Sequence, residues 1–278
     1  MGDGDVREAR QLVELRSGDG VSAPIVAIHG FLGSPAAFRD VAALVRHPGR
    51  FSAMRLPGHG PEPWGLELES FDDAVTAIAE ALPDHATHLL GYSMGGRIAL
   101  ALAERFPERT LSVTAVGAHS GLADEAARSA RRRIDLGWAA ELRTGGVASF
   151  VDAWERMPLF ATQSRLPDDA RATQRAARLS HTAEGLARAL EILGTGGMLP
   201  RDEGLRHLRV PVRLAVGGLD ADYLTHARTL ARSSPFFEVW VVGGAGHNLA
   251  LEAPAALARI VDELARSSTP RAASRRQP

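Results

Sequence analysis

A serine, an aspartate and a histidine in this chain have the types and order from which proteins build an activated serine nucleophile. Ser93 lies in Gly91-Tyr92-Ser93-Met94-Gly95, which has the pattern G-x-S-x-G. The residues before it, 87–90, predict a short buried strand, and residues 95–106 predict a helix. A serine on such a sharp turn adopts strained backbone angles, which small neighbours permit. The turn exposes the Ser93 hydroxyl and leaves the Met94 N–H at a helix N-terminus, where it can donate to a developing oxyanion.

A reactive serine needs a base, and the base needs a group that orients it. In one known order the acid follows the serine along the chain and the histidine comes last. Asp220 follows the apolar segment 210–216 and His247 follows 236–242, so each comes just after a predicted strand. Ligands gather at the carboxyl ends of parallel strands, which favours both residues. Asp222 is the alternative acid, but Asp220 is preferred because it closes the turn directly after the strand.

A second oxyanion donor is predicted near the N-terminus. Residues 25–28 predict a buried strand that leads into His29-Gly30-Phe31-Leu32-Gly33. The loop after an early strand supplies the second backbone N–H in this arrangement, and Phe31 is in position to donate it. His29 is expected to tie this loop to neighbouring backbone. His59, in the turn Leu56-Pro57-Gly58-His59-Gly60, is expected at the same rim without a chemical role.

Composition limits the class of protein. The 278 residues can bury a large core, and the absence of cysteine excludes disulfides, thiol catalysis and Cys-based zinc sites. No apolar run is as long as a membrane span, and the acidic first residues are unlike a signal peptide. With a net charge of −1, we expect a cytoplasmic protein that binds neither nucleic acid nor membranes. The composition leaves the oligomeric state open.

The order of the predicted elements indicates an α/β fold with an insertion. Strands and helices alternate from about residue 11 to 118, which is the pattern of a mostly parallel sheet with helices on both faces. Residues 121–205 have helical spacing without a clear strand, and the alternation resumes at Val210. Three parts are therefore predicted: a core of residues 1–120 and 206–266, a helical cap of residues 121–205 over the carboxyl edge of the sheet, and a disordered tail of residues 267–278.

Arginine side chains are placed to bind an anion beside the nucleophile. The chain has no lysine, so all 32 basic residues are arginine, which pairs with carboxylates bidentately and keeps its charge when buried. Arg97 lies four residues after Ser93, one turn into the helix, where it can point into the cleft. Arg131 and Trp138 share a helical face, on which Asp135 is a partner for Arg131. An ordinary solvated helix surface is the alternative for the arginines of the predicted cap.

The chain resembles the 2-succinyl-6-hydroxy-2,4-cyclohexadiene-1-carboxylate synthases of menaquinone biosynthesis, which are lyases with an α/β-hydrolase fold. The resemblance extends from about Ile25 to Pro254 and includes the motifs described above. More specific matches are His119-x-Gly121-Leu122, Asp152-x-Trp154 with Pro158-x-Phe160, and Gly244-x-Gly246-His247-Asn248. The chain departs from the family at Leu179-Ser180-His181-Thr182, where the family has asparagines.

The resemblance implies a set of site residues. The implied catalytic triad consists of Ser93, Asp220 and His247, and the implied oxyanion donors are the Phe31 and Met94 N–H groups. The implied substrate pocket is lined by Tyr92, Arg97, Arg131, Trp154 and Arg178.

The resemblance also implies a carbon–oxygen lyase that needs no cofactor and no metal. The implied reaction eliminates pyruvate from 2-succinyl-5-enolpyruvyl-6-hydroxy-3-cyclohexene-1-carboxylate, a small polycarboxylate, to give 2-succinyl-6-hydroxy-2,4-cyclohexadiene-1-carboxylate. His247 would deprotonate Ser93, whose oxygen removes the proton next to the succinyl carbonyl. The alternative is a serine hydrolase with the same triad, an esterase, thioesterase or carbon–carbon bond hydrolase, acting on a carboxylate-bearing substrate. A catalytically inactive receptor is disfavoured by the complete triad.

Overall fold

A central sheet positions the site residues at one of its edges. In residues 11–268, which the computed structural model describes, seven strands form this sheet in the order β1-β3-β2-β4-β5-β6-β7. Among them β1 is antiparallel to its neighbour, and every other pair is parallel. The strands are β1 (Leu12–Arg16), β2 (Ile25–Ile28), β3 (Phe51–Met54), β4 (Thr87–Tyr92), β5 (Thr110–Val116), β6 (Val212–Gly217) and β7 (Phe237–Val242).

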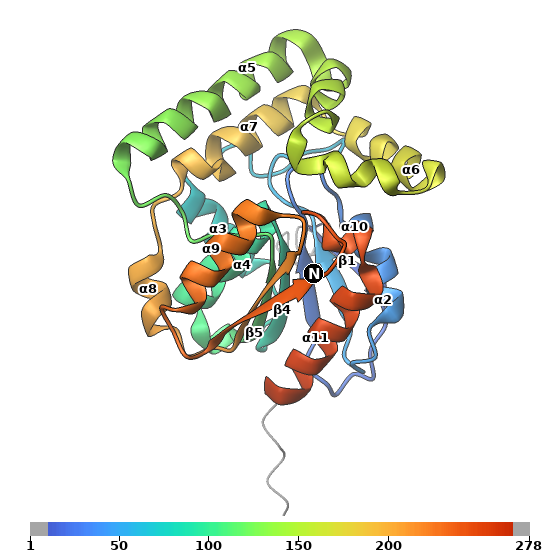
Figure 1. Ribbon diagram of the computed structural model, residues 1–278, viewed down its shortest axis with the longest axis vertical. Coiled ribbons are helices and arrows are strands. Elements are labelled where there is room, and N and C mark those ends of the chain that lie inside the picture. The colour runs from blue at the N-terminus through green and yellow to red at the C-terminus, as the bar shows by residue number, and fades with distance from the viewer. Residues whose placement is uncertain (1–10, 269–278) are drawn as a thin grey trace, which may run out of the picture.

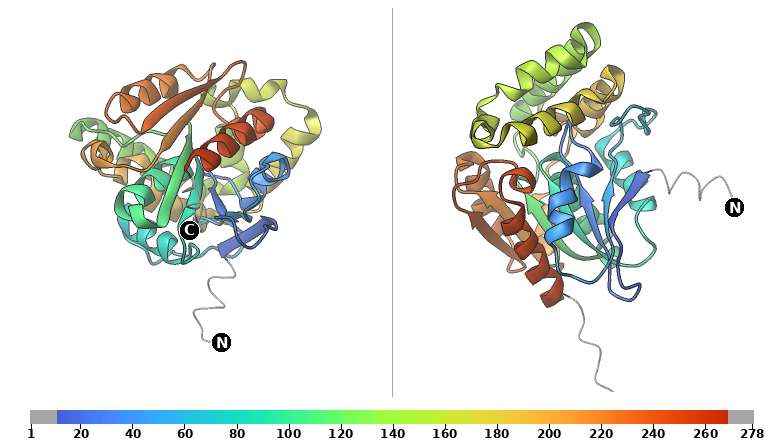
Figure 2. Two further views of the ribbon diagram at one scale, coloured as in Figure 1. Left: turned by 90° about the horizontal axis from the view of Figure 1, so that it is seen from below. Right: turned by 90° about the vertical axis from the view of Figure 1, so that its right-hand side faces the viewer.

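Helices cover both faces of the sheet (Figures 1 and 2). On one face pack α3 (Phe71–Glu80), α4 (Met94–Arg105) and α9 (Ala221–Ala231), and on the other α2 (Arg39–Leu44) and α11 (Pro254–Ser268). The central strands β2 and β4 are buried along their whole length. Strands covered on both faces have continuous apolar runs rather than alternation, as β2 does. The predicted α/β class, a mostly parallel sheet with helices on both faces, is confirmed.

The segment between β5 and β6 is helical and lies above the carboxyl edge of the sheet (Figure 1). It contains α5 (Glu125–Glu155), the 3₁₀ helix η3 (Pro158–Arg165), α6 (Asp168–Leu179), α7 (Ala183–Leu193), the 3₁₀ turn η4 (Thr195–Gly197) and α8 (Asp202–His207). The chain of α5 turns at Gly146, whose φ of 76° and ψ of 171° are not helical. A separate apolar cluster, which includes Leu142, Val151 and Leu186, joins these helices to Leu32 of the loop after β2.

The last helix runs further than the sequence predicts. α11 ends at Ser268, so Ser267 and Ser268 are helical and their assignment to the tail is wrong. Both hydroxyls donate to the Leu264 carbonyl oxygen, at 2.9 and 2.8 Å, which satisfies an acceptor near the helix end. The rest of the predicted tail and the acidic N-terminus lie outside the described residues. None of the described helices is long and apolar enough to cross a membrane.

Candidate active site

Ser93 occupies the turn between β4 and α4. Its φ of 53° and ψ of −110° are angles that residues with side chains rarely adopt. The turn is tight, because a Cβ added to Gly95 would lie 2.1 Å from the Ile28 carbonyl oxygen. The Ser93 N–H donates to the Val116 carbonyl oxygen at 2.8 Å, which fixes the turn to β5. The local structure around Ser93 is therefore that of the predicted nucleophile elbow.

Asp220 and His247 meet beyond the carboxyl ends of β6 and β7. The distance between His247 Nδ1 and Asp220 Oδ2 is 2.7 Å, and both side chains are buried. The carboxylate accepts the Nδ1 proton, so Nε2 carries the lone pair that a base needs. Nε2 is buried and has no hydrogen-bond partner among the described residues. The centre of the His247 ring lies 5.3 Å from that of Tyr92, the residue before the serine. The alternative acid, Asp222, is exposed, unlike the buried Asp220.

The loop after β2 brings a second backbone N–H next to the elbow. A Cβ added to Gly30 would lie 3.4 Å from Ser93 Cβ, so the loop and the elbow are in contact. Phe31 follows Gly30, and Met94 follows Ser93 as the first residue of α4. In the described part of the chain neither the Phe31 nor the Met94 N–H donates a hydrogen bond to another residue. Both groups are thus available to an oxyanion that forms beside Ser93.

Two buried histidines, His29 and His59, pack beside this loop. His29 donates from Nδ1 to the Gly30 carbonyl oxygen at 2.8 Å and accepts at Nε2 from the Leu56 N–H at 3.2 Å. This confirms its predicted structural role, and burial lowers its pKa to about 3, so the ring stays neutral. The ring of His59 lies between those of His29, at 4.9 Å, and His181 of the cap, at 5.3 Å. His59 is thus fully enclosed rather than open to a cleft.

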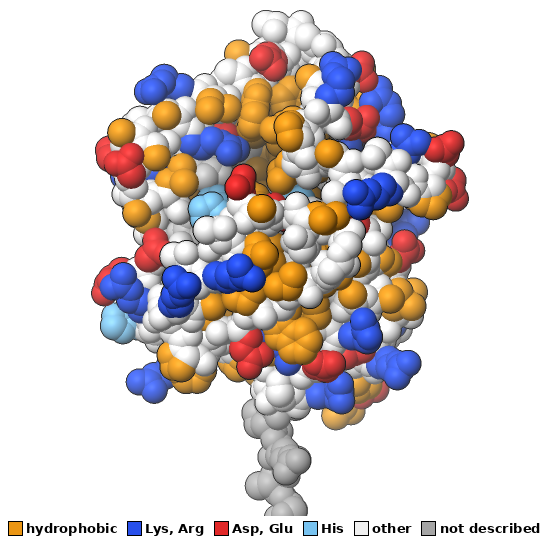
Figure 3. All heavy atoms as spheres, viewed as in Figure 1, with side chains coloured by type: hydrophobic (Ala, Val, Ile, Leu, Met, Phe, Trp, Pro, Cys, Tyr) orange, Lys and Arg blue, Asp and Glu red, His pale blue; other side chains and the backbone are white. Residues whose placement is uncertain are grey.

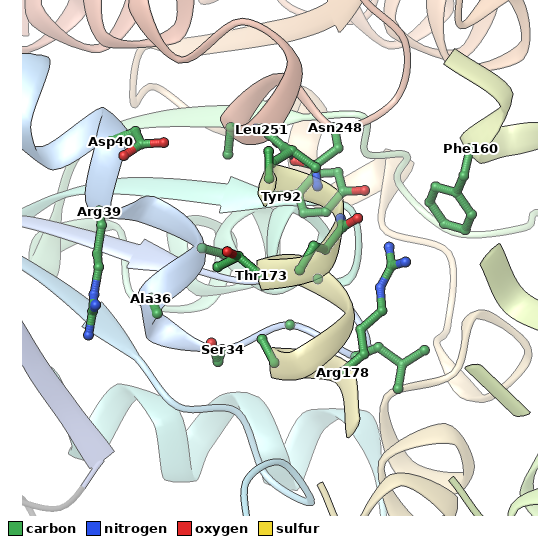
Figure 4. A pocket seen from close by; sticks show the side chains of 18 of the residues that line it. Ser34, Ala36, Arg39, Asp40, Tyr92, Phe160, Thr173, Arg178, Asn248 and Leu251 are labelled. Atoms are coloured by element: carbon green, nitrogen blue, oxygen red, sulfur yellow. Dashed lines mark hydrogen bonds between the residues drawn. The ribbon is translucent and has the colours of Figure 1, made fainter. Parts of the chain in front are cut away.

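A cavity of about 430 Å³ lies between the elbow, the loop after β2 and helix α6. Three predicted pocket residues, Tyr92, Trp154 and Arg178, line it. In Figure 4 the Arg178 guanidinium points into the space between Tyr92 and Phe160. It lies 5.6 Å from the centre of the Phe160 ring and pairs with Glu155 at 2.9 Å. The cavity therefore combines aromatic walls with one buried cation.

The other two predicted pocket arginines are not among the residues that line this cavity. Arg97 on α4 is 5% exposed, and its guanidinium donates to the Leu193 carbonyl oxygen at 2.9 Å and approaches Met198 Sδ at 3.7 Å. Burial lowers the pKa of Arg97 to about 10, so it still carries its charge at neutral pH. No carboxylate of the described residues forms an ion pair with it.

Arg131 belongs to α5 of the cap. Its Nε donates to Asp135 Oδ1 at 2.8 Å, as the helical spacing predicts, and its guanidinium lies 5.2 Å from the centre of the Trp138 ring. Asp135 is buried and also accepts from the Gly196 N–H at 3.0 Å. The positive charge of Arg131 adds to burial in lowering the pKa of Arg97, whereas the negative charge of Asp135 acts against this lowering. The terminal Nη groups of Arg131 make no hydrogen bond within the described residues, which leaves them for a ligand.

Two residues at this site were given no role from the sequence. Glu252 accepts from the N–H groups of Gly246, at 2.7 Å, and Asn248, at 3.1 Å, which flank His247. It therefore fixes the loop that carries the predicted base. Tyr223 packs against the His247 ring at 4.5 Å. The position of Glu252 shortly after a glycine-rich loop could have indicated its role in fixing that loop. Nothing in the sequence indicated a role for Tyr223, which lies in a helix.

A serine at a strand-to-helix turn, with a buried Asp–His pair at the next strand ends, is the arrangement of the α/β-hydrolase fold. The family model described as alpha/beta hydrolase fold matches residues 23–254. The protein is therefore an enzyme of this class.

Relatives define the family more closely. The 2-succinyl-6-hydroxy-2,4-cyclohexadiene-1-carboxylate synthase of Serratia proteamaculans (strain 568) is 32% identical over 249 residues, 88% of this chain and 93% of the relative. The structure of MenH from S. aureus has a TM-score of 0.88 and 25% identity, covering 93% of this chain and 98% of that chain. A thermophilic esterase from Thermogutta terrifontis, with malate bound, shares the fold at a TM-score of 0.79 and 22% identity, over 93% and 94% of the two chains. The chain belongs to the 2-succinyl-6-hydroxy-2,4-cyclohexadiene-1-carboxylate synthase family, which confirms the resemblance seen in the sequence.

Proposed function

We propose that this protein is a carbon–oxygen lyase of menaquinone biosynthesis. It eliminates pyruvate from 2-succinyl-5-enolpyruvyl-6-hydroxy-3-cyclohexene-1-carboxylate and releases 2-succinyl-6-hydroxy-2,4-cyclohexadiene-1-carboxylate, the compound in the names of its relatives. The observation that carries the proposal is Arg97, a buried cation one turn from Ser93 without a described carboxylate partner. An unpaired buried charge is costly in free energy, so the site favours a ligand that brings its own carboxylate.

Ser93 and His247 act as a proton relay in this reaction. Nε2 of His247 takes the Ser93 hydroxyl proton, and the serine oxygen removes the proton from the ring carbon next to the succinyl carbonyl. Asp220 holds the imidazole in the required tautomer and stabilises its positive charge. The resulting enolate oxygen accepts hydrogen bonds from the Phe31 and Met94 N–H groups, each worth about 3–4 kcal/mol in sites of this type.

Collapse of the enolate completes the elimination. Its electron pair returns to the ring, shifts the ring double bond and breaks the carbon–oxygen bond to the enolpyruvyl group. The leaving group departs as the enolate of pyruvate, which then takes up one proton. No bond is formed to Ser93 at any step, and no oxidant or reductant is consumed.

The charges of the site match a substrate with several carboxylates. Arg178 lines the cavity, and the charges of Arg97 on α4 and Arg131 on α5 influence each other. Cations on two sides of the reacting centre hold a polycarboxylate at both of its ends, which fixes the reactive carbon against Ser93. A neutral ester would leave the buried Arg97 without a carboxylate partner.

The test is to incubate the purified protein with the succinylated enolpyruvyl substrate and to follow pyruvate release. Wild-type protein is expected to release one pyruvate for each diene formed, and Ser93→Ala protein is expected to release almost none. Absence of pyruvate release from the wild type would contradict the proposal.

A hydrolase with the same triad is the second candidate, since the Thermogutta terrifontis esterase shares this fold. A hydrolase transfers an acyl group to serine, so a pulse of its substrate leaves a covalent adduct and a burst of product. As a lyase, this protein is expected to show no adduct by mass spectrometry of the quenched reaction, and little turnover of neutral p-nitrophenyl esters. An acyl mass on Ser93, with ester turnover exceeding pyruvate release, would establish the hydrolase instead.

A further inference from the structure

Tyr223 lies against the proposed base, on a side of the site that the cavity beside α6 does not reach. It belongs to the first turn of α9, and its ring centre is 4.5 Å from that of His247. Its hydroxyl makes no hydrogen bond to any residue between 11 and 268. Figure 3 shows the crevice between the cap and the core on this face, with histidine and arginine side chains at its rim.

His119 is a second unused donor beside this phenol. Its ring, just after β5, stacks on Tyr223 with 6.1 Å between centres and 29° between planes. Nδ1 accepts from the Gly121 N–H at 3.0 Å, so the single proton of the neutral ring is on Nε2. Burial lowers the pKa of His119 to about 3, which keeps the ring neutral. Nε2 makes no hydrogen bond to the described part of the chain.

The charges of Arg97 and Arg131 act on both donors. Burial raises the pKa of Tyr223, and the positive charges of Arg97 and Arg131 act against this rise. The net direction is upward, so the phenol keeps its proton at neutral pH. After burial, the same two charges contribute to the lowered pKa of His119. Two neutral donors whose rings stack on each other are therefore within the electrostatic influence of the Arg97 and Arg131 guanidinium groups.

We propose that Tyr223 and His119 bind the substrate carboxylate that Arg97 and Arg131 attract, as neutral hydrogen-bond donors that complete its coordination. This inference rests on the proposed function for the identity of the ligand. A carboxylate offers about four acceptor positions, so it can accept from the phenol and the imidazole as well as from a guanidinium group. Arg97 and Arg131 already repel each other, so further donors without charge are favoured over a third cation.

The position of Tyr223 connects this contact to the chemistry. Its ring packs against His247, so a carboxylate bound at its hydroxyl is held at a fixed distance from the base. The two residues thereby select polycarboxylates and set how tightly they bind. A phenylalanine would provide the same ring packing without the donor, which separates a binding role from a packing role.

The first experiment is steady-state kinetics of Tyr223→Phe in the pyruvate-release assay. KM is expected to rise by about tenfold, the size expected for loss of one hydrogen bond to a charged group, with kcat changed by less than about twofold. Thr225→Val is the matched control, because its hydroxyl, on the same helix, is exposed and donates only to the Ala221 carbonyl oxygen at 3.0 Å. An unchanged KM in Tyr223→Phe would overturn the inference.

The second experiment measures binding by calorimetry and does not depend on turnover. The probes are 2-succinylbenzoate, a stable aromatic dicarboxylate with the succinyl and ring carboxylates of the product, and its two monomethyl esters. Tyr223→Phe and His119→Phe are expected to weaken binding of the dicarboxylate and of one monoester, and to leave the other monoester unchanged. Equal weakening of all three probes, or no binding to the wild type, would overturn the inference.

The two experiments fail in different ways. A wild type that binds the probes with this ester selectivity but releases no pyruvate would refute the proposed function and retain the carboxylate contact. Normal pyruvate release with uniform affinities across the probes would retain the function and refute the contact.

Discussion

Ser93, Asp220 and His247 depend on one another, because a serine hydroxyl is a weak base without the imidazole and the imidazole needs a fixed tautomer. The 2.7 Å contact between His247 Nδ1 and Asp220 Oδ2 supplies that tautomer. We therefore expect Ser93→Ala, Asp220→Asn and His247→Ala each to lower kcat by about a thousandfold or more, since each removes part of one proton relay. Circular dichroism is expected to show an unchanged fold in all three.

The control for the acid is Asp222→Asn, which alters an exposed carboxylate two positions away. Its pyruvate release is expected to stay close to that of the wild type. An inactive Asp222→Asn beside a nearly normal Asp220→Asn would reverse the assignment of the acid.

Arg97 and Arg131 are expected to act through charge on the bound substrate. Replacing either by alanine should cost about 2–5 kcal/mol of transition-state stabilisation, measured as kcat/KM, because each would pair with a desolvated carboxylate. Arg133→Ala, on the exposed face of α5, is the matched control and should leave kcat/KM within about twofold. If kcat/KM falls by less than tenfold in both Arg97→Ala and Arg131→Ala, the two residues have a structural role and do not bind the substrate.

Some site residues could be predicted from the sequence because their signals are local. The strand–serine–helix pattern around Ser93 and the positions of Asp220 and His247 after strands depend on short segments. The surroundings of Arg97 depend on Leu193 and Met198, about a hundred residues further along the chain, so only its position on the helix was predictable. A binding role for Tyr223 could not be predicted, because a tyrosine in the first turn of a helix can equally well serve only to pack against its neighbours.

At the scale of elements, the bounds of the strands were predicted closely, whereas the bounds of the cap helices were not. β2 has the predicted bounds, and β6 begins at Val212 rather than Val210, because Pro211 has no N–H for the ladder. The cap sequence gave helical spacing but not the turn of α5 at Gly146. Helices on a surface can end at many positions in an Ala- and Arg-rich segment, whereas buried strands must match the width of the sheet.

The elbow can be tested as an element by adding a single methyl group. In Gly95→Ala the new Cβ would lie 2.1 Å from the Ile28 carbonyl oxygen and 2.6 Å from that of His29, both backbone atoms that cannot move aside cheaply. We expect a loss of unfolding free energy of about 2 kcal/mol or more, and a loss of activity, because β2 and α4 must separate. Urea denaturation measures the first and pyruvate release the second.

The matched control is Gly137→Ala, in the exposed part of α5, where an added Cβ meets nothing within 4 Å. This change should raise the unfolding free energy by about 0.5–1 kcal/mol, because alanine favours the helix more than glycine does. A stability for Gly95→Ala equal to that of Gly137→Ala would show that the elbow is not tightly packed.

At the scale of the whole molecule, buried histidines make folding sensitive to acid. His29, His88 and His119 are buried, and burial lowers their pKa values to about 3, 4 and 3 respectively. In the unfolded chain a histidine titrates near pH 6.5, so below that pH the unfolded state binds protons that the folded state does not. The contribution to stability is therefore complete above about pH 7.5 and is lost as the pH falls from 6.5 towards 4.

His88 allows this loss to be measured away from the site. It lies in β4, and its Nδ1 is 2.8 Å from Ser112 Oγ, a contact that glutamine can replace. Between pH 7 and pH 5 one such histidine contributes a loss of about 2 kcal/mol of unfolding free energy. Urea denaturation at the two pH values should thus show a loss about 2 kcal/mol smaller in His88→Gln than in the wild type, with pyruvate release at pH 7 unchanged. Equal losses in the two proteins would mean that His88 is already protonated in the folded state at pH 5, so that burial does not lower its pKa.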